Sequence, residues 1–260
     1  MTRNLSKILV PLLIAFLFIQ SALAMDLLVP AYFYPGANWD KLTTAARKVG
    51  IVAIANPHNG PDTTRNDDYT RAITNLRNAG GRVIGYVSTN YTKRPSTKVK
   101  VDIDRWMSFY PNINGIFFDE MSSGKTLTSK DSIQAHINYY RDLTSYVKTR
   151  YAGRDLVVAN PGTSFLEAYL TSNCADCFVI FESCTGFDSW RSDSWVKSSP
   201  KKRFAVLPYS ICKPETMNAT VDRAFNEGAG LVYVNDDSGC NPWDTLPPYW
   251  DALVSKVALK

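Results

Sequence analysis

The sequence predicts an α/β protein that folds as a single (β/α)8 TIM barrel. Eight short runs of apolar, β-branched and aromatic residues follow one another along the chain. Their starts lie about 22 to 40 residues apart, which leaves room for one helix after each strand. Once an N-terminal leader of 24 residues is removed, 236 residues remain, close to the usual size of about 250 residues for this fold.

We predict that residues 1–24 form a secretory signal peptide. Arg3 and Lys7 precede a 12-residue apolar run from Ile8 to Ile19, and Ala22-Leu23-Ala24 resembles a cleavage site. The run is shorter than the roughly 18 residues that a membrane-spanning helix needs. Residues 25–260 are therefore expected to be one soluble domain that is secreted, or periplasmic if the source is bacterial, with no membrane partner after cleavage.

The eight predicted strands alternate with segments of helical periodicity. The predicted strands are Leu27–Tyr34, Ile51–Asn56, Arg82–Ser88, Gly115–Met121, Asp155–Asn160, Cys177–Ser183, Arg203–Ser210 and Gly230–Asp236. The clearest helical segments are 69–79, 132–151 and 216–227. A doubly wound open sheet is the alternative, but such a sheet usually carries G-x-G-x-x-G after its first strand. Here Tyr34-Pro35-Gly36-Ala37 follows that strand, so the barrel is favoured.

Composition and charge argue against nucleic-acid binding. Apolar residues make up 45% and charged residues 20% of the chain, ordinary values for a folded soluble protein. Cleavage after residue 24 removes Arg3 and Lys7 and lowers the formal net charge from +5 to +3. The tight basic clusters, Lys98 with Lys100 and 201–203, do not form a stripe. We expect these basic side chains to lie on the protein surface in contact with solvent.

Five cysteines lie in the last third of the chain. They are Cys174, Cys177, Cys184, Cys212 and Cys240. In an oxidising compartment cysteines usually pair, so we expect one or two disulfides, whose connectivity stays open. Because five is an odd number, one thiol is left free or pairs between chains. The single C-x-x-C has no matching second pair, and both histidines, His58 and His136, are distant in sequence. Neither a zinc site nor a catalytic metal is expected.

Polar and aromatic residues stand where the predicted strands end. Because the active site of a TIM barrel lies at the carboxyl ends of its strands, these residues are candidates for substrate binding. Tyrosine and tryptophan offer flat apolar faces with polar edges, which suit sugar rings. The candidates are Tyr34, Asn56, Asn59, Tyr86, Asn160, Tyr209, Asp236 and Trp243.

Three carboxylates end two of the strands. Asp119 and Glu120 follow the apolar strand four, and Glu182 follows the apolar strand six. Each acid could instead cap a helix or pair with an arginine, but a buried charge without partners is costly, and acids at both strand ends favour a site. Two carboxyl groups across a barrel mouth are the equipment for glycoside hydrolysis, which needs no cofactor. Since side chains alternate along a strand, only one of Asp119 and Glu120 should face the substrate.

Several motifs resemble the spherulation-specific family 4 (spherulin-4-like) domain. They include Gly85–Tyr91 followed by Arg94-Pro95, then Val101–Trp106 and Gly115–Met121. The resemblance spans nearly the whole mature chain. The spherulin-4-like family is similar to glycoside hydrolase family 135. This resemblance implies an enzyme that cleaves α-1,4-linked N-acetylgalactosamine within exopolysaccharides such as galactosaminogalactan.

The resemblance also implies roles for the three acids. The family's Asp-Glu pair at the end of strand four corresponds to Asp119 and Glu120, and its strand-six acid corresponds to Glu182. We interpret Asp119 as the nucleophile or electrostatic stabiliser, Glu182 as the general acid/base, and Glu120 as an orienting partner. A mechanism that retains anomeric configuration is favoured over inversion.

Two other functions remain open at this point. The barrel could be a non-catalytic carbohydrate-binding, cell-wall or spore-coat protein, or a polygalactosaminidase that prefers deacetylated polymer. In each case we expect a monomer whose partner is an amino-sugar polysaccharide.

Overall fold

The computed structural model describes residues 24–239 and 241–260, so the predicted signal peptide lies outside the described residues apart from Ala24. Eight parallel strands follow chain order around a closed barrel, and β8 pairs back with β1. The predicted (β/α)8 barrel is therefore confirmed. The strands are β1 (Asp26–Ala31), β2 (Ile51–Ala55), β3 (Arg82–Ser88), β4 (Gly115–Asp119), β5 (Leu156–Ala159), β6 (Cys177–Ser183), β7 (Phe204–Pro208) and β8 (Leu231–Val232).

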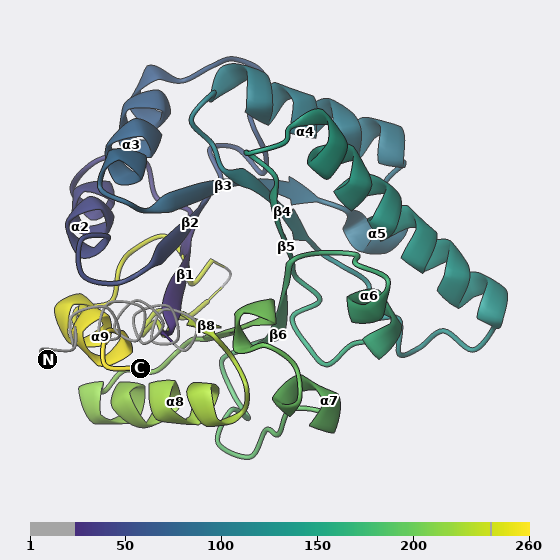
Figure 1. Cartoon of the computed structure of the whole chain (residues 1–260). Coiled ribbons are helices and arrows are strands. Elements are labelled where there is room, and N and C mark those ends of the chain that lie inside the picture. The colour runs from purple at the N-terminus through teal and green to yellow at the C-terminus, as the bar shows by residue number, and fades with distance from the viewer. Residues whose placement is uncertain (1–23, 240) are drawn as a thin grey trace, which may run out of the picture.

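Helices surround the strands, as Figure 1 shows. They are α2 (Ala37–Ala45), α3 (Asp67–Asn78), α4 (Ser96–Phe109), α5 (Lys130–Arg150), α6 (Glu167–Thr171), α7 (Ser194–Lys197), α8 (Pro214–Asn226) and α9 (Trp250–Val257), with short 3-10 turns at Asn90–Thr92 and Lys201–Arg203. The three predicted helical segments correspond to α3, α5 and α8. Each strand is thus followed by a helix, although α6 and α7 are only one turn long.

The strands are buried on both faces because side chains fill the barrel and helices cover it. Inside, the Tyr86 ring lies 6.2 Å from the Phe117 ring. Outside, the Trp106 indole of α4 lies against Gly85 of β3 and donates to the Tyr86 carbonyl at 2.8 Å. A Cβ at Gly85 would come within 2.3 Å of that indole, so only glycine allows α4 to pack this closely.

Strand β6 contains one extra residue relative to β7. Val179 pairs with Ala205 and Glu182 pairs with Leu207, so three steps along β6 match two along β7. This β-bulge reverses the alternation of side chains along β6. Ile180 and Phe181 consequently both turn outward, where Phe181 packs against Phe187 and Trp190.

The first and last strands are shorter than expected. β1 ends at Ala31 instead of Tyr34, and β8 covers Leu231–Val232 instead of continuing to Asp236. The Tyr32 amide bonds to the carbonyl of Trp243 in the loop after β8, at 3.3 Å. The polar residues predicted as strand ends therefore belong to the loops at the mouth of the barrel.

The described cysteines are free thiols. Cys174 and Cys177 are buried, whereas Cys184 and Cys212 are exposed. The expected disulfides are thus absent among these four residues, and Cys240 lies outside the described residues. Cys174 and Cys177 pack as small apolar side chains in the hydrophobic core, and burial raises the pKa of each thiol to about 12.

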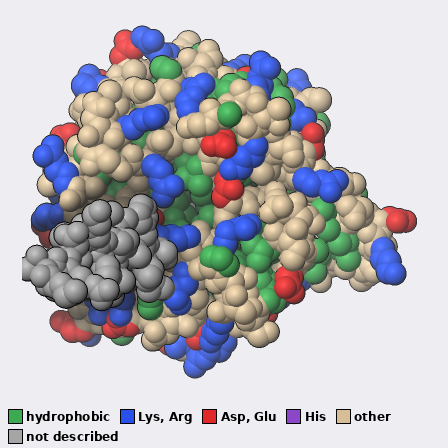
Figure 2. All heavy atoms as spheres, viewed as in Figure 1, with side chains coloured by type: hydrophobic (Ala, Val, Ile, Leu, Met, Phe, Trp, Pro, Cys, Tyr) green, Lys and Arg blue, Asp and Glu red, His purple; other side chains and the backbone are tan. Residues whose placement is uncertain are grey.

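Residues 24–239 and 241–260, which the structure describes, contain neither a membrane-spanning helix nor a metal-binding cluster of the kinds defined next. No helix there is long and apolar enough to cross a membrane. No group of three or more His, Cys, Asp or Glu residues there could hold a metal ion. On the face shown in Figure 2, Lys and Arg side chains are scattered and have Asp and Glu side chains among them.

Candidate active site

The amide of Asn160 joins two of the predicted catalytic carboxylates at the mouth of the barrel. Asp119 ends β4, Asn160 follows β5, and Glu182 lies near the end of β6. The Asn160 Nδ2 donates to Asp119 Oδ1 at 2.8 Å and to Glu182 Oε2 at 2.6 Å. Because both oxygens bind the same nitrogen, they can be no farther apart than these two hydrogen bonds laid end to end.

The two carboxyl groups have different environments. Burial, and then the charge of Asp119, raise the pKa of Glu182 to about 7. Burial also raises the pKa of Asp119, although hydrogen bonds from Tyr86 and Asn160 oppose the increase. A carboxyl group that titrates near neutrality can hold a proton and give it up at working pH, which is what a general acid/base requires.

The backbone of Glu120 leaves the strand conformation of β4. It has a left-handed conformation, with φ of 53°, where β4 has ended. Its carbonyl accepts hydrogen bonds from the Thr89 hydroxyl at 2.9 Å and from the Tyr91 amide at 2.8 Å. The Glu120 carboxylate accepts a hydrogen bond from the Ser88 hydroxyl. Glu120 and Asp119 thus have different hydrogen-bond partners, and which of them faces a substrate stays a prediction.

Motif residues outside the mouth support the end of β3. Arg94 donates to the Ser88 carbonyl at 2.9 Å and forms an ion pair with Asp102 of α4. The Tyr139 hydroxyl of α5 in turn donates to the Arg94 carbonyl at 2.6 Å. These contacts hold the strand end that carries Ser88, and through it the Glu120 carboxylate.

Aromatic side chains surround the carboxylates on two sides. On one side the rings of Tyr32 and Tyr86 meet edge to face at 5.8 Å. On the other side Tyr209 and Trp243 lie 5.4 Å apart, and the Trp243 side chain lowers the pKa of Glu182 against the effect of burial. The site is therefore a polar centre with apolar walls, as in many sites for small sugar units.

A hollow of about 370 Å³ lies next to this centre, on the side of β1 and β2. It is lined by Tyr32, Asn56, Pro57, His58, Asn59 and Asn241. Tyr32 connects the hollow to the carboxylates, since its ring also contacts Tyr86. The Asn56 Oδ1 accepts a hydrogen bond from the Gly60 amide at 2.9 Å, so this side chain also fixes the loop after β2.

The structure gathers half of the predicted substrate-binding residues around the carboxylates. Asn160 forms hydrogen bonds to both Asp119 and Glu182. Tyr86 lowers the pKa of Asp119, Trp243 lowers the pKa of Glu182, and Tyr209 packs against Trp243. Their role in binding a substrate stays a prediction.

The other half lies farther out. Asn56 and Asn59 line the neighbouring hollow. The Tyr34 side chain, which is 61% exposed, donates to Asp68 of α3 at 2.7 Å. Asp236 follows β8, where burial raises the pKa of its carboxyl group. These four residues lie on the rim, outside the network of hydrogen bonds that joins Asp119 and Glu182.

Three residues of the site were not among the predicted site residues: Tyr32, Ser88 and Thr89. Tyr32 and Ser88 stand at predicted strand ends, a position that was itself the available signal. Their residue types are common on any protein surface, so the position alone did not distinguish them.

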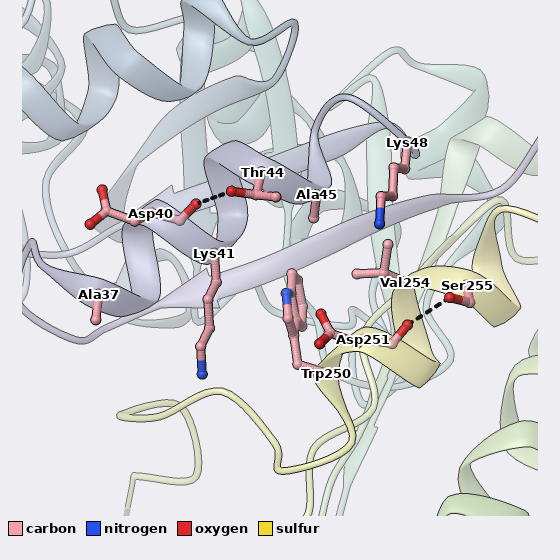
Figure 3. A pocket seen from close by; sticks show the side chains of 10 residues that line it. All are labelled: Ala37, Asp40, Lys41, Thr44, Ala45, Lys48, Trp250, Asp251, Val254 and Ser255. Carbon is pink, nitrogen blue, oxygen red and sulfur yellow. Dashed lines mark hydrogen bonds between the residues drawn. The ribbon is translucent and has the colours of Figure 1, made fainter.

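Another hollow, of about 300 Å³, lies between α2 and α9 on the outside of the barrel (Figure 3). Lys41 comes from α2, Lys48 from the turn after α2, and Trp250 and Asp251 from α9. No strand end of the barrel contributes to it. We therefore place the candidate active site at the carboxylates.

Comparison with known proteins now identifies the family. The family model for spherulation-specific family 4 matches residues 26–257. The chain belongs to this family. Spherulin-4 of Physarum polycephalum is 34% identical over 259 residues, which cover 95% of this chain and 74% of that protein. The resemblance predicted from the sequence motifs is thus confirmed.

Solved structures agree with the family assignment. Sph3 of Aspergillus clavatus, crystallised in complex with GalNAc (N-acetylgalactosamine), has a TM-score of 0.75 and 25% identity to this member of the family. The match covers 90% of this chain and 98% of the Sph3 chain. A GH99 endo-α-mannosidase from Bacteroides thetaiotaomicron has a TM-score of 0.51 at 13% identity, which concerns the fold alone. Both solved structures therefore share the barrel fold of this chain.

Proposed function

We propose that this member of spherulation-specific family 4 is a glycoside hydrolase that cleaves α-1,4-linked N-acetylgalactosamine or galactosamine within an exopolysaccharide. The observation that carries the proposal is the pair of carboxyl groups, Asp119 and Glu182, joined through one amide by hydrogen bonds of 2.8 Å and 2.6 Å. The similarity to Sph3, which was crystallised with GalNAc, supports the choice of sugar.

The chemistry follows from the two environments. Glu182, protonated below about pH 7, donates its proton to the glycosidic oxygen as the bond to the anomeric carbon breaks. The Asp119 carboxylate bonds to the anomeric carbon and forms a glycosyl-enzyme ester. Glu182, now ionised, then takes a proton from water, whose oxygen displaces Asp119 from that carbon.

The short separation supports retention of configuration. Retaining glycosidases have carboxyl groups about 5 to 5.5 Å apart, whereas inverting enzymes need about 6.5 to 9.5 Å to admit water between them. The two carboxyl oxygens that bind one nitrogen, at 2.8 Å and 2.6 Å, lie closer together than the group separation typical of inverting enzymes. The bridged oxygens therefore fit the retaining arrangement.

Export and a monomeric state are parts of the same proposal. The predicted leader at residues 1–24 would send the enzyme to the compartment where such polymers accumulate. We expect the polysaccharide to be its partner.

The test is the release of reducing ends from an α-1,4-galactosamine-containing exopolysaccharide, with masses of the products. The mature protein is compared with Asp119→Asn and Glu182→Gln, and with the exposed-surface controls Asp131→Asn and Glu167→Gln. We expect release by the mature protein and both controls, and a fall of at least about a hundredfold for each active-site variant.

Acetylated and deacetylated polymers separate the substrate classes. Faster cleavage of the deacetylated polymer would identify a polygalactosaminidase. Polymer binding without release of any product by the folded protein would contradict the hydrolase and favour a carbohydrate-binding or coat protein.

A further inference from the structure

The backbone of Asn160 is fixed to the strand that carries Asp119. Its amide donates to the Phe118 carbonyl of β4 at 2.8 Å, and its carbonyl accepts from the Met121 amide at 2.9 Å. The residue therefore has little freedom to move relative to the end of β4. Its side chain is the part that reaches across to Glu182 of β6.

The orientation of the Asn160 amide is set by charge. Exchanging its oxygen and nitrogen would bring the oxygen against the Asp119 carboxylate, and both of these groups are acceptors only. In the observed orientation Oδ1 is buried and has no hydrogen-bond partner within the described residues. A buried acceptor without a donor costs free energy. The amide thus binds both carboxylates although its own oxygen is left unpaired, which points to a function for the N–H groups beyond packing.

We propose that Asn160 is the positioning residue that holds Asp119 and Glu182 at their working separation through its single NH₂ group. This inference rests on the proposed function, and it changes the role predicted from the sequence, where Asn160 was a substrate-binding candidate. Two carboxylates close together repel one another, and two N–H groups on one nitrogen offset that repulsion without adding charge.

The chemical consequence is a coupling of two titrations. Hydrogen bonds from Asn160 lower the pKa of both Asp119 and Glu182 against the effect of burial. Loss of these hydrogen bonds should therefore raise the pKa of both carboxyl groups. The nucleophile would then ionise, and the acid would lose its proton, only at higher pH.

The experiment compares the wild-type protein with Asn160→Ala and Asn160→Ser. Serine keeps a hydroxyl donor that is too short to bridge both acids. Asn138→Ala, an exposed asparagine on α5 that bonds to Gln134 and Arg141, is the matched control. Carboxyl groups labelled with ¹³C are titrated by NMR, with Asp119→Asn and Glu182→Gln used for assignment, and the pH dependence of kcat and KM is measured.

We expect both carboxyl titrations to move to higher pH in the Asn160 variants and to stay in place in Asn138→Ala. The pH profile of kcat should move in the same direction, with kcat at its optimum lower by about a hundredfold and KM little changed. Unchanged titrations in a folded Asn160 variant would overturn the inference. Absence of turnover in the wild-type protein would instead reject the proposed function, because the NMR titration needs no turnover.

Discussion

At the scale of single residues, the proposed mechanism depends on two acids that are needed in opposite protonation states. Asp119 must be ionised to attack, and its raised pKa puts the acid limit of activity above the ordinary aspartate range. Glu182 must be protonated, and its pKa of about 7 sets the alkaline limit. We expect a bell-shaped dependence of kcat/KM on pH, with the upper limb near pH 7. Full activity maintained above pH 9 would contradict the assignment of Glu182 as the acid.

Glu182 should also reduce the stability of the fold at alkaline pH. Its pKa is higher in the folded protein, about 7, than the ordinary value of 4.5, so the folded state holds this proton more tightly. Stability is therefore lost as the pH rises from about 4.5 to 7 and then levels off. We expect Glu182→Gln to raise the free energy of unfolding at pH 8 by up to about 3 kcal/mol, and by little at pH 4. Urea denaturation at both pH values measures the difference.

At the scale of elements, the contact between α4 and β3 depends on a missing side chain. Gly85→Ala would place a methyl group 2.3 Å from the Trp106 indole, so α4 or β3 must shift. We expect a loss of about 1 to 3 kcal/mol in the free energy of unfolding, measured by urea denaturation. Gly36→Ala is the control, since a Cβ there meets no atom within 4 Å. Equal stability of the two variants would show that the contact can relax.

The elements also show what the sequence could and could not predict. The apolar runs and their spacing were sufficient for all eight strands, and acids at the ends of β4 and β6 were found by position. The bulge in β6 was not predicted, because Ile180 and Phe181 are both apolar and either could face the barrel or the helices. The Asn160 bridge and the Ser88 contact involve side chains from different strands, and such distances cannot be read from spacing.

At the scale of the whole molecule, the parallel order of β4, β5 and β6 brings Asp119, Asn160 and Glu182 together at one edge of the barrel. The carboxyl separation that results predicts retention of anomeric configuration. Proton NMR of the first products should show the α-anomer before mutarotation begins. Initial release of the β-anomer would establish inversion, and would require the two acids to move apart when substrate binds.

The described cysteines do not form the disulfides that we expected from the sequence. The four described cysteines are thiols, and two of these belong to the core, where no partner is needed for stability. Cysteine count and compartment favoured disulfides, but whether two sulfur atoms can meet depends on the folded geometry. Cys174 and Cys177 act as core side chains because the fold buries them, and their burial could not be read from the sequence.

The bulge in β6 means that strand register, as well as side-chain identity, brings Glu182 to the mouth. If the same residues paired with β7 without the bulge, strict alternation would return. Glu182, four residues after Phe178, would then face the helices together with Phe178. A relative that keeps every acid and this length but lacks the bulge would therefore turn its glutamate away from the barrel mouth. Inventories of active members in this family should therefore align the register of β6 before they count its glutamate.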